Sequence, residues 1–108
     1  MARIAKRLSG PALLSAVAAT QYTVPALTKT IIRHIHVDNT TVSSATLTIS
    51  IGANASATQI FTSFSIAANS VLDHFCYYIM DVGEILQALS GTASALNFVV
   101  DGDEIILG

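Results

Sequence analysis

The sequence predicts an all-β fold, a single-domain β-sandwich or jelly roll of about seven to nine short antiparallel strands. Three observations support this. Apolar and polar residues alternate with a period of two through most segments, β-branched residues dominate those segments, and turn-forming residues separate them roughly every ten positions. A chain of 108 residues has apolar material for one core, so we expect one domain.

The first residues differ in composition from the rest. Residues 1–11 are predicted to form an extended basic N-terminal arm, and residues 12–108 the β-sandwich domain. Ser9-Gly10-Pro11 is a turn signal, and its proline bars a continuous helix. Residues 12–24 are interpreted as one or two short strands, with a helical turn as the alternative.

The most regular strand pattern follows the break at Pro25. Residues 31–37 are predicted as a strand, and residues 38–41 as a turn. Strict alternation then divides the strand into two rows of side chains. One row holds Ile31, Arg33, Ile35 and Val37, and the other holds Ile32, His34 and His36.

Two further strands are expected at residues 46–51 and 60–66, where apolar residues alternate with Ser and Thr. Residues 84–89 and 95–100 are two more expected segments, each preceded by a turn signal. The segment 101–107 is read either as a hairpin or as the end of one long strand kinked at Gly102.

Residues 71–80 are nearly all apolar in both rows of the predicted strand. Phe75, Tyr77 and Ile79 form one row, and Cys76, Tyr78 and Met80 form the other. Such a strand is expected to be central in the sandwich or covered by a partner. Tyr77 and Tyr78 are therefore predicted partner-binding residues, because aromatic side chains are common anchors of interfaces.

The charge is low and unevenly placed. Only 11% of the residues are charged, against about 25% in an average soluble domain, which favours packing against other protein. Arg3, Lys6 and Arg7 are three of the five basic residues, while all seven acidic residues come later. We expect these three to clamp an acidic neighbouring subunit, so deleting residues 1–8 should weaken attachment but leave the domain folded.

His34 and His36 are the one sequence pair that resembles metal ligands. Residues two apart on a strand point to the same face, and a third ligand is sought at Asp38, in phase, or at His74 on another strand. An ordinary polar face is the preferred interpretation, and a contact across a subunit symmetry axis is a variant of it. No metal or other cofactor is predicted.

No enzymatic centre is predicted either. Asp101, Asp103 and Glu104 lack the ligand spacing of a calcium loop and are interpreted as a solvated turn. The lone Cys76 excludes an internal disulfide. Three basic residues are too few to indicate nucleic-acid binding, and no apolar run is long enough for a membrane helix.

The order of motifs resembles a family of small tailed-bacteriophage virion proteins with a β-sandwich fold. The resemblance covers most of the chain after Gln21, with one departure at Val82-Gly83-Glu84, where a Gly-Asp pair is expected. The matching stretches are residues 22–26, 31–39, 45–52, 65–70, 82–88 and 95–105.

This resemblance implies a structural protein of the virion, assembled in the host cytoplasm. A capsid decoration (cement) protein that binds the major capsid protein across shell subunits is the first interpretation, and a homo-oligomer, preferably a trimer, is expected. A neck, tail or fibre-attachment protein is the alternative, and a carbohydrate-binding module is a third class. The family pattern is structural, so it assigns no functional residue.

Overall fold

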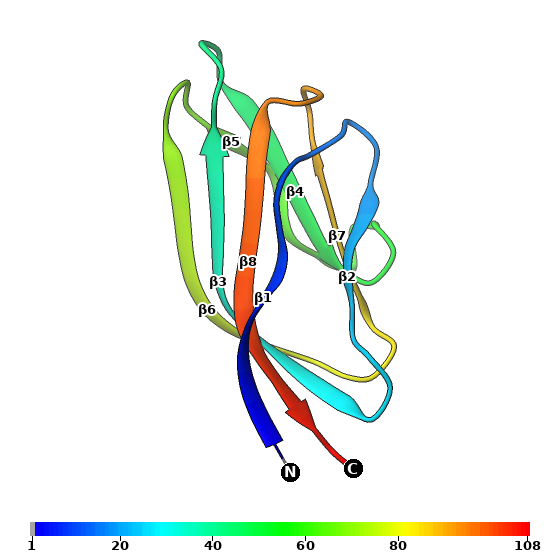
Figure 1. The fold of residues 1–108 in the computed structure, drawn as a ribbon. Coiled ribbons are helices and arrows are strands. Elements are labelled where there is room, and N and C mark those ends of the chain that lie inside the picture. Colours follow the sequence, from blue (N-terminus) through cyan, green and yellow to red (C-terminus); the bar gives the residue numbers. More distant parts are fainter. Residues whose placement is uncertain (1) are drawn as a thin grey trace.

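The computed structural model describes residues 2–108, and within them the chain is entirely β-structure and loops. Eight strands form two antiparallel four-stranded sheets, which pack face to face (Figure 1). The described residues include no helix long and apolar enough to cross a membrane. The strands are β1 (Ala2–Leu13), β2 (Ala19–Thr23), β3 (Thr28–Asn39), β4 (Ala45–Ile51), β5 (Gln59–Ile66), β6 (Val71–Met80), β7 (Ile85–Ser90) and β8 (Leu96–Ile106).

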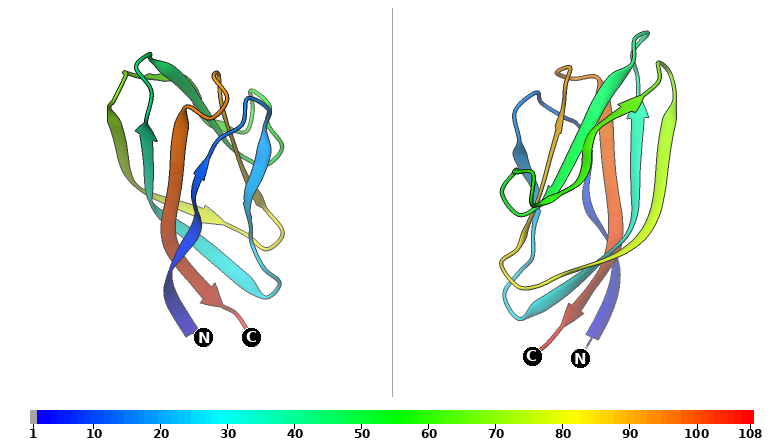
Figure 2. Two further views of the ribbon diagram at one scale, coloured as in Figure 1. Left: turned by 45° about the horizontal axis from the view of Figure 1, so that its top comes forward. Right: turned by 180° about the vertical axis from the view of Figure 1, so that it is seen from behind.

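The strand order is that of a jelly roll. Sheet A has the order β1-β8-β3-β6 and sheet B the order β2-β7-β4-β5. The first strand therefore pairs with the eighth, the second with the seventh, the third with the sixth and the fourth with the fifth. Both termini lie at the same end of the sandwich (Figures 1 and 2). The predicted all-β sandwich is confirmed.

Apolar side chains from both sheets fill the space between them. Ile32, Ile35 and Val37 of β3 and Leu47 and Ile49 of β4 belong to this core, and all five residues are fully buried. β-Branched residues suit these positions because they pack well on a pleated surface. We call the side of each sheet turned toward this core its inner face, and the other side its outer face.

A β-bulge in β3 changes the predicted arrangement of its side chains. The register shifts between Ile32 and His34 in the ladders to both β6 and β8. In the ladder to β8, Ile32 pairs with Gly102 and His34 with Asp101, so Arg33 is an extra, exposed residue there. Ile32 consequently joins Ile35 on the inner face, whereas strict alternation assigned them to opposite rows. The prediction failed because a bulge reverses the phase of every residue beyond it.

The predicted arm is part of sheet A. Residues 2–13 pair with β8 as an edge strand, with Ala2 opposite Ile106 and Leu13 opposite Asn97. Leu8 of this strand is buried in the core. The expected boundary between residues 11 and 12 thus falls inside β1.

Residues 96–106 form one strand, so the expected hairpin in segment 101–107 is absent. β8 runs without interruption through Gly102, which lies opposite Ile32. A Cβ atom built at Gly102 would lie 2.1 Å from the carbonyl oxygen of Ile31, so only glycine permits this approach of the backbones. The interpretation as a kinked long strand was the better of the two alternatives.

Candidate functional site

The outer face of sheet A carries a row of exposed apolar side chains on β6. We call these residues the apolar row: Val71, Phe75, Tyr77 and Ile79. Each is more than half exposed, and Phe75 reaches 77%. β6 lies at the edge of sheet A, which excludes the first of the two expected alternatives, a central strand, and among residues 2–108 nothing covers this row.

The two tyrosines predicted as partner-binding residues lie on opposite faces. Tyr77 belongs to the exposed row, and the guanidinium of Arg33 lies 5.7 Å from the centre of its ring. Tyr78 packs against the core, and its hydroxyl lies 3.2 Å from Nε2 of His74. Burial raises the pKa of Tyr78 above its ordinary value. The inward position of Tyr78 leaves Tyr77 as the residue of this pair that is open to a partner.

Two of the three basic residues of β1 make ion pairs within the chain. Arg3 contacts Asp103 on the outer face at 2.6 Å, and the same carboxylate binds Arg33 at 3.2 Å. Lys6 points the other way and contacts Glu104 at 3.1 Å. Arg3 and Lys6, which the sequence analysis assigned to an acidic neighbouring subunit, therefore already have partners within the chain.

Arg7 lies beside a shallow open groove of about 480 Å³. No ion pair is recorded for Arg7 among residues 2–108, although it stands opposite Asp101 in the register. The groove contains both cationic and anionic side chains, so its charge is mixed. Its lining comprises Ala5, Lys6, Arg7, Arg33, Asp101, Gly102 and Asp103.

The acidic segment of β8 is not the solvated turn that was predicted. Asp103 and Glu104 are both largely buried, and they point to opposite faces because successive strand residues alternate. Glu104 enters the space between the sheets, where it accepts hydrogen bonds from Lys6 and from the hydroxyl of Tyr22. The Tyr22 hydroxyl is also within 2.8 Å of Oγ1 of Thr30.

These contacts change the acid–base properties of both groups. Burial, and then the hydrogen bond to Glu104, raise the pKa of Tyr22 from 10.0 to about 12. Burial opposes ionisation of Glu104, but the hydrogen bonds from Tyr22 and Lys6 outweigh it and lower the pKa of Glu104 below its ordinary value. Glu104 is therefore a charged carboxylate held between the sheets.

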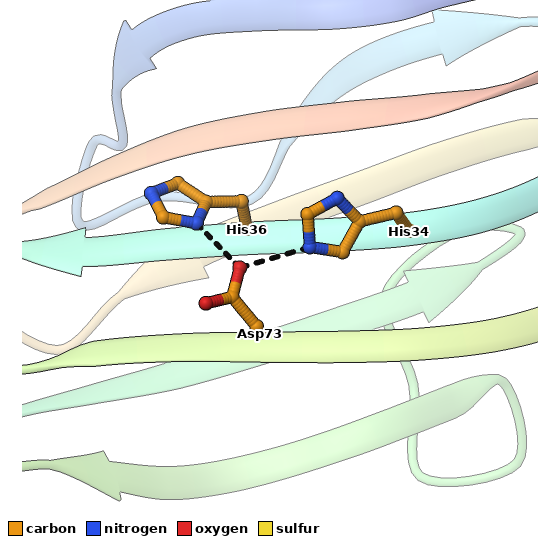
Figure 3. Close-up of side chains that lie close together, drawn as sticks. All are labelled: His34, His36 and Asp73. Atoms are coloured by element: carbon orange, nitrogen blue, oxygen red, sulfur yellow. Dashed lines mark hydrogen bonds and ion pairs between the residues drawn. The ribbon is translucent and has the colours of Figure 1, made fainter.

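A histidine–aspartate cluster lies on the outer face of sheet A, where β3 and β6 are adjacent (Figure 3). Oδ1 of Asp73 is 2.6 Å from Nδ1 of His36 and 2.9 Å from Nε2 of His34. Hydrogen bonds from His36 and His34 lower the pKa of Asp73. The ring of His34 stacks on Phe75 with its centre 4.4 Å away and an interplanar angle of 5°.

The predicted third ligands are not in this cluster. His74 lies on the inner face, where its ring packs edge-on against Phe61. Asp38 stands opposite Val71 and does not join the group of donor atoms around His34 and His36. Asp73 was missed because strand alternation places residues on a face but does not align β3 with β6.

Comparison with known proteins found no family model, no curated protein and no solved structure that matches this chain.

Proposed function

We propose that the chain is a structural, non-enzymatic protein of a tailed-bacteriophage particle, a capsid decoration protein that binds across shell subunits. The apolar row on β6 is the observation that carries the docking part of this proposal. The virion part rests on the sequence resemblance. Jelly rolls are frequent in viral capsid proteins, but a fold alone does not assign a function.

The energetic argument concerns Phe75, Tyr77 and Ile79. Burial of one such side chain against a partner contributes about 1.5–3 kcal/mol relative to leaving it in water. The row is long and lies on a sheet edge with few charges of its own, as expected for a surface that another protein covers. Repetition of a modest contact over many subunits then gives large mechanical stability.

The basic residues have a narrower role in this proposal than the sequence suggested. Arg3 and Lys6 are engaged with Asp103 and Glu104, so Arg7 is the basic residue of β1 that is assigned to an acidic group of the partner. Homo-oligomerisation, with a trimer as the preferred state, remains part of the proposal. The partner is the major capsid protein.

Copy number tests the location in the particle. Quantitative mass spectrometry of purified particles should find this chain on the order of hundreds of times per particle if it decorates the shell, because shell symmetry repeats each binding site. About a dozen copies or fewer would indicate the alternative, a neck, tail or fibre-attachment protein. Complete absence from particles would refute a virion role.

Variants of the apolar row test the docking surface. Tyr77→Ser combined with Ile79→Ser should abolish binding to particles that lack the chain, while the variant remains folded by circular dichroism. Val42→Ser is the matched control, because Val42 is exposed but lies in the loop between β3 and β4, outside the row. Equal binding by the double variant and the wild type would exclude the apolar row as the docking surface.

A carbohydrate-binding module is a second candidate, favoured by one specific observation. Phe75 and Tyr77 are exposed aromatic rings beside the polar side chains of His34 and Arg33. Such a combination suits sugars, which pack an apolar face on a ring and hydrogen-bond at the rim. A glycan array probed with wild type and with Tyr77→Ser distinguishes this candidate from protein docking.

A further inference from the structure

His34, His36 and Asp73 bring three metal-ligating atoms together on an open surface. His36 and Asp73 face each other in the β3–β6 register, and His34 lies two positions along β3 on the same face. Figure 3 shows both rings turned toward the carboxylate. We propose that these three residues form a binding site for a divalent transition-metal ion of the Zn²⁺ type.

The spacing suits such an ion after a small adjustment. The donor atoms all lie within 4.8 Å of one another. Zinc holds nitrogen and oxygen ligands at about 2.0–2.2 Å, which places neighbouring ligands of a tetrahedron roughly 3.3 Å apart. Oδ1 of Asp73 lies 2.6 Å from Nδ1 of His36 and 2.9 Å from Nε2 of His34. To reach the spacing of zinc ligands, this oxygen needs to move away from the two nitrogens by less than about 1 Å. Asp73 is about half exposed on an edge strand, which leaves room for that movement.

The surroundings of His34 already orient its ring for this role. Phe75 stacks flat against one side of the imidazole. The second ring nitrogen, Nδ1, faces the carboxylate of Asp101 at 3.8 Å. Histidines that bind metals commonly direct their other nitrogen at a carboxylate, which fixes the tautomer and the ring orientation. At 3.8 Å the Asp101 carboxylate is too far for a hydrogen bond, so in this proposal it supports His34 through its negative charge alone.

The ligand types select the class of ion. Two imidazoles and one carboxylate suit Zn²⁺ and its neighbours among the divalent transition metals, whereas Ca²⁺ and Mg²⁺ prefer oxygen ligands. Three protein ligands leave a fourth tetrahedral position, which water fills on the solvent side. The bound ion would replace the two hydrogen bonds to Asp73 and join β6 to β3 through its ligands.

The metal proposal does not require the virion role, although Phe75 belongs to both surfaces, and direct binding of the metal alone tests it. The full chain without an affinity tag, stripped with a chelator and dialysed, is titrated with zinc chloride in a calorimeter. One ion should bind per chain. His34→Ala, His36→Ala and Asp73→Asn should each weaken binding by at least about tenfold, and Asp101→Asn by less.

Asp38→Asn and His74→Gln are the matched controls, since each removes a nearby potential ligand that lies outside the cluster. Both should bind Zn²⁺ as the wild type does. Saturating Zn²⁺ should also raise the unfolding temperature of the wild type and of both controls, but not that of His36→Ala, because an ion bound only to the folded state stabilises it.

Co²⁺ provides a readout of geometry. Its visible absorption in the wild type should have the intensity typical of a tetrahedral site and should disappear in the His34→Ala, His36→Ala double variant, whose folding is checked by circular dichroism. The proposal is overturned if the wild type binds neither ion, or if the double variant binds Zn²⁺ with unchanged affinity. In either case the cluster is only a hydrogen-bonded polar group.

Discussion

The hydroxyl of Tyr22 on β2 donates a hydrogen bond to the carboxylate of Glu104 on β8, and so joins the two sheets through a polar contact. Most other contacts between the sheets involve apolar side chains. Glu104 is 5% exposed, and Lys6 supplies its charge partner from the edge strand. A buried carboxylate is tolerated where such donors satisfy it.

Tyr22→Phe should lower the free energy of unfolding by about 1–2 kcal/mol, because Glu104 loses a hydrogen bond while it remains buried. Urea unfolding followed by circular dichroism measures the difference. Tyr77→Phe is the matched control: its ring is exposed and no hydrogen bond is recorded for its hydroxyl within residues 2–108. If both variants lose the same free energy of unfolding, the hydrogen bond between Tyr22 and Glu104 does not account for the destabilisation.

Acid should weaken the fold partly through Glu104. The pKa of Glu104 in the folded state is below its ordinary value of 4.5. A lowered pKa contributes stability above the unfolded-state value, and that contribution is lost as the pH falls through the folded-state pKa. The free energy of unfolding should therefore decline below a pH of about 4.5, and less steeply in Glu104→Gln. If the free energy of unfolding falls equally with pH in the wild type and in Glu104→Gln, Glu104 does not contribute to the acid sensitivity.

Gly102→Ala should destabilise the protein by about 1–3 kcal/mol, since the new methyl group meets the backbone of β3 and one of the strands must shift. Gly91→Ala is the comparison. Its methyl group would meet Oγ1 of Thr46, a side-chain atom that can rotate away. Thermal unfolding should show a larger loss of stability for Gly102→Ala than for Gly91→Ala. The reverse order would contradict the close approach of the backbones at Gly102.

Deletion of residues 1–8 should destabilise the domain, contrary to what the sequence suggested. The deletion removes most of β1, uncovers β8 and takes Leu8 out of the core. Arg3→Gln keeps the strand and removes one of its charges. Chemical unfolding should show a much smaller loss for this charge variant, because the Arg3 side chain is about half exposed and Asp103 keeps its ion pair with Arg33. Full stability of the truncated chain would show that β1 is dispensable.

Most of the fold was predictable because strand formation leaves a local signal. The alternation in residues 46–51 and the two rows of residues 71–80 are visible without knowledge of any partner strand. The position of β6 at an edge was not predictable, because exposure of Phe75 and its row depends on which strands lie beside and above it. An apolar pattern is the same whether a sheet or another protein covers it.

The candidate metal cluster was likewise only partly predictable from the sequence. Sequence reasoning placed His34 and His36 on one face, and the structure agrees, since both lie beyond the bulge at Arg33. The sequence did not identify Asp73, which lies on β6, 37 residues after His36. The register that brings it there is a property of the paired strands together.

The amino-acid sequence by itself determined that this protein is all-β, where most of its strands lie and, away from the bulge in β3, which neighbouring residues share a face, because these properties depend on contacts a few residues apart. Only the tertiary structure decided the jelly-roll order, the phase change at Arg33 and the meeting of Asp73 with the two histidines. Those depend on pairing between distant segments, and no local pattern encodes the register of one strand against another.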